Sequence, residues 1–95
     1  MSDAAPLDGG AVLRFAPHVR FRYDERRQAW IVLAPERLFL PDEQAVEVLH
    51  LVDGTRSMDM IIDELAGRFD APRGEIAADV LPMLQDLLAK HVLQQ

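Results

Sequence analysis

The 95-residue chain contains no cysteine. This absence excludes a disulfide framework, an iron–sulfur cluster or zinc site held by the chain's own thiolates, and a thiol nucleophile. Aromatic residues make up only 6% of the chain, so a core must consist mainly of Leu, Val, Ile and Met. No apolar run approaches the roughly 20 residues that span a bilayer, and the N-terminus lacks the pattern of a signal peptide. We therefore expect a soluble, cytoplasmic protein without a membrane partner.

The apolar content of the chain is sufficient for one small domain. Hydrophobic residues make up 49%, which is normal for a globular chain and too high for a disordered one. Residues 1–13 are rich in Asp, Ala and Gly and lack periodicity, so we expect a flexible N-terminal tail there. Residues 14–95 are expected to form a single domain.

Charge is divided unevenly along the chain. Residues 1–40 carry six Arg against five acidic residues, a net charge of +1. Residues 41–95 carry four basic against eleven acidic residues, a net charge of −7. Because nucleic-acid binding requires clustered Lys and Arg that face phosphates, the acidic second half argues against a nucleic-acid partner.

Three short segments with β-like patterns occupy residues 18–40. Val19, Phe21 and Tyr23 alternate with arginines, which predicts a half-buried strand. Residues 24–28 form a polar loop, and residues 29–34 form a nearly continuous apolar run typical of a central strand. After a turn at Pro35, residues 37–40 predict a third strand. Together these segments predict a three-stranded antiparallel sheet.

Helical patterns follow from about residue 42 to residue 91. Asp42 is the expected N-cap of the first helix, and Gly54 is expected to end it in a left-handed conformation. Ser57 or Thr55 is expected to cap the second helix. The second helix should bury one stripe, Ile61, Ile62, Leu65 and Phe69. The whole chain is thus expected to be an α+β protein, in which the sheet is followed by a three-helix bundle.

The third helix, about residues 73–91, carries more apolar surface than one layer of neighbours needs. Its large apolar residues span an arc of about 160°, against roughly 100° for an ordinary surface helix. These residues are Ile76, Val80, Leu81, Met83, Leu84, Leu87 and Leu88. Pro82 lies within the helix and is expected to kink it near Ala78. The excess suggests that part of the arc faces a partner.

No constellation of catalytic residues is present in the sequence. The three histidines, His18, His50 and His91, lie on separate predicted elements and lack a second ligand at helical spacing. The serines are Ser2 in the tail and Ser57 at a helix start. No glycine-rich phosphate loop follows a strand. We expect no enzyme activity, no metal and no cofactor.

A binding surface is the remaining interpretation. A sheet of three strands has two open edges, and an open edge is either protected or used. Residues 37–40 could pair with a peptide strand while the apolar arc of the third helix forms the second wall of a groove. Alternatively, the third helix covers the third strand and both are core; periodicity favours neither arrangement. If a peptide pairs there, Phe39→Pro is expected to abolish binding by removing a ladder donor.

Several short motifs resemble the PqqD family of pyrroloquinoline quinone biosynthesis proteins. The motifs are Trp30 in its strand, Ala34-Pro35-Glu36-Arg37, Asp53-Gly54 and Ala78-Asp79-Val80. The resemblance covers about residues 14–93. The chain departs from the family at Pro41-Asp42, where a Leu-Asn pair is usual, at His91, where the family tends to have Gly, and at Pro82.

The resemblance implies a winged-helix-like fold and a role as a non-catalytic peptide chaperone. Such a protein binds a ribosomally made precursor peptide by strand addition and presents it to a radical SAM enzyme, which cross-links a Glu and a Tyr of the peptide. The residues implied in peptide binding are Arg37, Leu38, Phe39 and Leu40 of the third strand and Val80, Met83, Leu84 and Leu87 of the third helix. Leu81 and Leu88 are the alternative if the helix presents its other side.

Two alternative functions are weighed against this one. A winged-helix DNA-binding protein should carry Arg, Lys, Asn or Gln on the exposed face of its recognition helix. The third helix offers Asp79, Gln85, Asp86 and a single lysine, Lys90, which makes this alternative weak. A homodimer that exchanges elements between protomers could instead use the same edge strand, since the connections are short.

Overall fold

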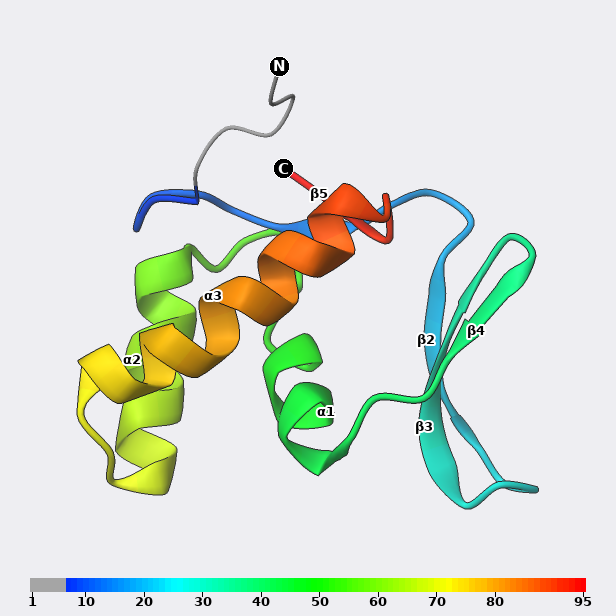
Figure 1. Ribbon diagram of the computed structural model, residues 1–95, viewed down its shortest axis with the longest axis horizontal. Helices are drawn as coiled ribbons and strands as arrows, with labels where there is room; N and C mark the ends of the chain where they lie inside the picture. The colour runs from blue at the N-terminus through cyan, green and yellow to red at the C-terminus, as the bar shows by residue number, and fades with distance from the viewer. Residues whose placement is uncertain (1–6) are drawn as a thin grey trace.

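The computed structural model describes residues 7–95. It contains three helices, a three-stranded antiparallel sheet and a small two-stranded sheet (Figure 1). The elements in chain order are β1 (Arg14–Phe15), β2 (Arg20–Asp24), β3 (Ala29–Ala34), β4 (Arg37–Phe39), α1 (Glu43–Leu49), α2 (Met58–Phe69), α3 (Arg73–Ala89) and β5 (Leu93–Gln94). The predicted combination of a three-stranded antiparallel sheet with three helices is confirmed.

The three-stranded sheet has the order β2-β3-β4, so β3 is central and both neighbours are edges. Asp24 organises the loop between β2 and β3, because its carboxylate accepts from the Arg26 N–H at 2.9 Å and from Arg27 Nη1 at 2.7 Å. The bond from the Arg27 side chain makes the largest contribution, and together these bonds lower the pKa of Asp24. Ala34 pairs with Arg37 across the two-residue turn that joins β3 to β4.

The helices begin where the sequence predicts but do not all end there. The Asp42 carboxylate accepts from the Ala45 N–H at 2.8 Å and Ser57 Oγ from the Met60 N–H at 3.2 Å, so both predicted caps are confirmed. Gly54 has the predicted positive φ of 81°, but α1 already ends at Leu49. Leu51 and Val52 follow α1 in a turn and still join the helical core with Val48.

Both ends of the described chain differ from the prediction. Residues 9–13, expected in a flexible tail, hydrogen-bond to the start of α2: the Met58 N–H donates to the Ala11 carbonyl at 2.8 Å. Leu13 is only 1% exposed, because β1 pairs with β5 and holds this segment over the helices. The third helix ends at Ala89, close to the predicted end at about residue 91, and the unpredicted strand β5 follows it. Residues 1–6 of the predicted tail lie outside the described residues.

Two apolar clusters hold the molecule together. The larger lies among the three helices, with α3 packed across α2 (Figure 1). The smaller joins the sheet to α1 and the C-terminal segment through Val32, Leu49 and Val92. None of the helices in residues 7–95 combines the length and apolar character that crossing a membrane requires. One hollow of the surface lies where the two clusters meet.

Candidate functional site

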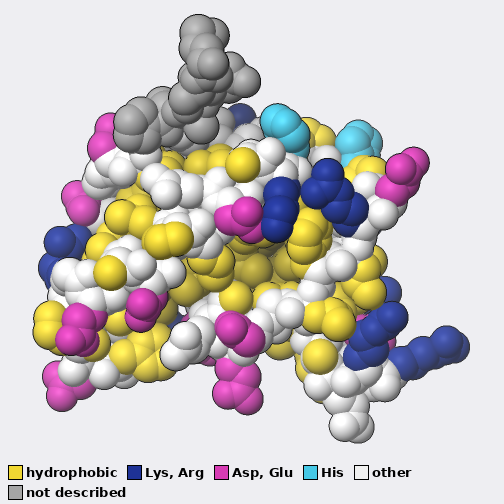
Figure 2. Space-filling view, viewed as in Figure 1, with side chains coloured by type: hydrophobic (Ala, Val, Ile, Leu, Met, Phe, Trp, Pro, Cys, Tyr) yellow, Lys and Arg dark blue, Asp and Glu magenta, His cyan; other side chains and the backbone are white. Residues whose placement is uncertain are grey.

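An apolar hollow of about 190 Å³ separates β4 from α3. One wall consists of Phe39, the last residue of β4, and Leu40, which follows it. The other wall consists of Met83 and Leu87 of α3. The remaining lining residues are Val32, Pro41, Ala45 and Leu49. Figure 2 shows apolar side chains gathered in this central part of the surface, between the helices and the sheet. The third helix therefore does not close over the third strand, and an apolar cleft stays open beside a sheet edge.

The register of the hairpin shows which backbone groups of β4 face the open edge. Ala34 and Arg37 flank a two-residue turn, so they form a hydrogen-bonded pair, and hydrogen-bonded pairs alternate with unbonded ones along an antiparallel ladder. Phe39, opposite Val32, is therefore bonded to β3. Leu38, opposite Leu33, points its N–H and C=O away from β3. Leu38 thus supplies the free donor and acceptor of this edge.

The eight residues predicted to bind a peptide do not all lie in one place. Phe39, Leu40, Met83 and Leu87 line the hollow, whereas the side chain of Leu38 lies on the opposite face of the sheet, since successive strand residues alternate. Arg37 is exposed at the start of β4. The expectation that Leu84 lines the groove is wrong, because Leu84 is 0% exposed within the helical cluster. Peptide binding by the other residues stays a prediction.

The alternative side of α3 is not free. Leu81 and Leu88 pack against the helical cluster and are half-buried. Val80 is also buried there, although it reaches the edge of a second hollow. The apolar arc of α3 is thus divided, with one part in the helical core and Met83 and Leu87 left toward β4.

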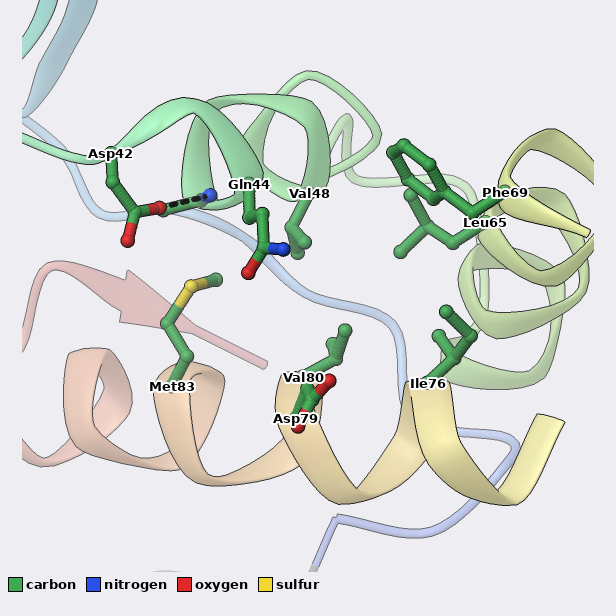
Figure 3. A pocket seen from close by; sticks show the side chains of 10 residues that line it. Asp42, Gln44, Val48, Leu65, Phe69, Ile76, Asp79, Val80 and Met83 are labelled. Atoms are coloured by element: carbon green, nitrogen blue, oxygen red, sulfur yellow. Dashed lines mark hydrogen bonds between the residues drawn. The ribbon is translucent and has the colours of Figure 1, made fainter. Parts of the chain in front are cut away.

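The second hollow, of about 430 Å³, lies among α1, α2 and α3. Figure 3 shows side chains from the three helices pointing into it: Asp42, Gln44 and Val48 from the α1 side, Leu65 and Phe69 from α2, and Ile76, Asp79, Val80 and Met83 from α3. Ala45 completes the lining. The prediction that Phe69 belongs to the buried stripe of α2 is wrong, because Phe69 is 51% exposed at the last turn of that helix. No local signal distinguishes it from the buried positions of the same stripe.

A third hollow lies on the other side of α1, and Phe69 contributes to it as well. It adjoins an aromatic cluster in which the rings of Trp30 and His50 approach edge to face with centroids 4.5 Å apart. Tyr23 joins this cluster from β2, 5.8 Å from Trp30. His50 is therefore part of a packing arrangement rather than a separate polar site.

Charged side chains lie at the borders of both hollows. Lys90 lies 5.8 Å from the centre of the Phe39 ring and pairs with Asp86 at 2.8 Å. Asp42 and Asp79 border the second hollow. Within residues 7–95 no group of three or more His, Asp or Glu side chains is placed to hold a metal ion.

Comparison with known proteins finds relatives that all belong to one family. The sequence model of the family "Coenzyme PQQ synthesis protein D (PqqD)" matches residues 29–93. A PqqA binding protein of Rhodopseudomonas palustris (strain BisB5) is 53% identical over 78 residues, which cover 82% of this chain and 76% of that protein. A PqqA binding protein of Gluconobacter oxydans is 48% identical over 84 residues, 88% of each chain.

A solved structure resembles the fold as a whole. It is the solution NMR structure of the PqqD truncation of Methylobacterium extorquens PqqCD, a stand-alone recognition element for a ribosomally synthesised and post-translationally modified peptide. The TM-score is 0.78 at 44% sequence identity, over 94% of this chain and 95% of that one. The likeness therefore extends over nearly the whole of both chains.

Proposed function

The chain belongs to the PqqD family, and from this premise we propose that it binds the PqqA precursor peptide in pyrroloquinoline quinone biosynthesis without catalysing a reaction. Relatives that share about half of its sequence are named as PqqA binding proteins. The similar solved structure is a recognition element for a modified peptide. The role fits a surface that offers an apolar cleft and an open strand edge.

We infer that the peptide binds by adding a strand to β4. The observation that carries this inference is the juxtaposition of the free Leu38 backbone with the apolar hollow between Phe39 and Met83. An added strand would bond to the edge and place alternate side chains in the hollow. The β2 edge is less suitable, because Arg20 and Arg22 are exposed along it and charged side chains protect edges.

The size of this surface sets the expected affinity. An added strand gains two backbone hydrogen bonds from Leu38 within β4, and about four to six if the pairing continues past both ends of β4, each worth about 0.5–1.5 kcal/mol net. Ordering the free peptide consumes much of this gain. A dissociation constant in the micromolar to sub-micromolar range is therefore expected. This corresponds to a binding free energy of about −8 kcal/mol or slightly more favourable.

The enzyme that modifies the bound peptide is proposed to be a separate radical SAM protein, which cross-links a Glu and a Tyr of the peptide. The chain has no cysteine to hold an iron–sulfur cluster, so this chemistry requires another protein. We place the encounter in the cytoplasm, where a ribosomally made peptide first becomes available.

A winged-helix-like arrangement stays a prediction, and DNA binding is not its best use here. The exposed side of α3 carries Glu75, Asp79 and Asp86, which would repel phosphates rather than neutralise them. Self-association through β4 is the other alternative. It is compatible with peptide binding if the peptide displaces the second copy from the edge.

Calorimetric titration of the purified protein with PqqA tests the proposal, with a duplex DNA fragment as the control titrant. We expect saturable binding of one peptide per chain and no heat with DNA. Mass measurement over a range of protein concentrations, with and without PqqA, tests self-association. Absence of PqqA binding by a folded, monomeric sample would contradict the proposed function.

A further inference from the structure

The hollow among α1, α2 and α3 has no part in strand addition to β4, yet it is the more spacious of the two. Its volume is about 430 Å³, against about 190 Å³ for the hollow beside β4. Most of its walls are apolar, and Phe69 leaves half of its surface in water there. An exposed phenylalanine beside a concave apolar surface is unfavourable in the free protein and favourable for a ligand that covers it.

The two hollows are neighbours along the path of an added strand. Ala45 and Met83 line both of them. The chain leaves β4 at Phe39 and reaches Asp42, at the border of the second hollow, three residues later. The second hollow therefore lies beyond the C-terminal end of β4. Both strand pairs of this sheet are antiparallel, and we take the added strand to continue that pattern. Its N-terminal residues then lie at that end of β4.

Charge adds a second requirement for the occupant. Asp42 and Asp79 line the second hollow, and neither forms an ion pair within the described residues. At the opposite end of the groove Lys90 lies beside Phe39, but its charge is paired with that of Asp86 at 2.8 Å. Figure 2 shows acidic side chains below the central hollow, and basic and acidic side chains together above it. A basic residue is thus favoured near the second hollow, where the two carboxylates have no cationic partner within the described residues.

We propose that this hollow is a second peptide subsite. It takes a large apolar side chain, with a Lys or Arg beside it, from the part of the precursor peptide that precedes its strand-forming segment. The apolar side chain covers Phe69 and Ile76, while the neighbouring cation lies near Asp42 and Asp79. The subsite rests on the proposed function, because it binds the same peptide whose central segment pairs with β4.

The test compares Phe69→Ser with Met60→Ser in calorimetric titrations with PqqA. Both residues lie on α2 and are about equally exposed, at 51% and 54%, but Met60 lines neither hollow. We expect Phe69→Ser to weaken PqqA binding by about 10-fold, as lost burial of half an aromatic side chain predicts. Met60→Ser should bind as the unchanged protein does. Asp79→Lys should weaken binding by about threefold at low salt and less at high salt.

Truncated peptides give an independent measurement on the same proteins. A nested set of PqqA peptides shortened from the N-terminus should reach a length at which affinity for the unchanged protein falls by about 10-fold. Peptides shorter than this should bind the unchanged protein and Phe69→Ser equally. That equality would show that Phe69 acts through the removed segment and not through the fold.

The outcomes separate this inference from the function on which it rests. If the unchanged protein does not bind PqqA, the proposed function fails. If PqqA binds but Phe69→Ser and Met60→Ser are alike, or if N-terminal truncation has no effect, the subsite is wrong while the function stands. Tyr23→Ser controls for the third hollow, which Phe69 also lines. Loss of affinity in Tyr23→Ser and Phe69→Ser but not in Asp79→Lys would place the segment in that third hollow and overturn the proposal.

Discussion

Leu38→Pro provides the sharpest test of strand addition to β4. The register places the Leu38 N–H on the open edge, so proline removes a donor that β3 does not use. Edge strands tolerate proline where the N–H faces solvent, and the Leu38 side chain is itself 42% exposed. The substitution should therefore leave the three-stranded sheet assembled. Phe39→Pro is a poorer choice than the sequence suggests, because the Phe39 N–H bonds to β3.

The size of the effect follows from one lost hydrogen bond. In the complex, proline would leave a peptide carbonyl without its donor, which costs about 1–3 kcal/mol. This corresponds to about a 5-fold to 150-fold increase in the dissociation constant at 25 °C. The free energy of unfolding should change by less than about 1 kcal/mol, as is usual for surface substitutions away from bonded backbone.

The assay is calorimetric titration with PqqA, together with urea unfolding of each variant. Leu38→Ala is the matched control, because it removes the same side chain and keeps the N–H; its affinity should stay close to that of the unchanged protein. Phe39→Pro should instead lose stability. Unchanged PqqA affinity in a folded Leu38→Pro sample would refute strand addition at β4. Equal losses in Leu38→Pro and Leu38→Ala would show that the side chain, and not the backbone, makes the contact.

Three further predictions concern the packing and the turns. Leu84→Ala should lower the free energy of unfolding by about 2–5 kcal/mol, measured by urea unfolding, whereas Met83→Ala, at the groove wall, should lower it less and weaken PqqA binding more. Leu13→Ala should cost about 2–5 kcal/mol by the same assay, since Leu13 is buried in the helical cluster; an unchanged midpoint would support the flexible tail instead. Hydrogen bonds from the Thr55 and Arg56 backbone lower the pKa of Asp53 from 3.8 to about 2. The stability that ionised Asp53 contributes is therefore complete above pH 3.8 and is lost as the pH falls toward 2. Asp53→Asn should therefore make the free energy of unfolding less dependent on pH in this acid range. Carboxyl NMR should show that the pKa of Asp53 is about 2.

Much of the local structure could be predicted from the sequence because its causes are local. Asp42 and Ser57 cap helices through bonds to backbone groups three residues ahead, and such bonds depend only on nearby residues. The strands of the sheet follow from alternation and turn residues within single segments. The open β4 edge also followed, since a strand followed by helices has no further partner in the sheet.

The candidate site could be predicted only in part, because a helical arc does not indicate which neighbour covers which side. Met83 and Leu84 are adjacent in the sequence and equally apolar, yet one borders the groove and the other is fully buried. The difference arises from how α3 lies against α2, and that orientation depends on contacts between distant segments. Phe69 illustrates the same limit. It continues the buried stripe of α2 in the sequence, but in the structure it is exposed because α3 does not cover the last turn of α2.

The sequence by itself determined the sheet, the helix starts, the edge strand and, through its motifs, the family. The tertiary structure alone decided that residues 9–13 pack on α2, that β1 pairs with β5, and that α1 ends before Gly54. It also decided which part of the α3 arc is left open beside β4. These features share one physical reason: each depends on free energy from contacts between segments far apart in the chain, which no local pattern of residues records.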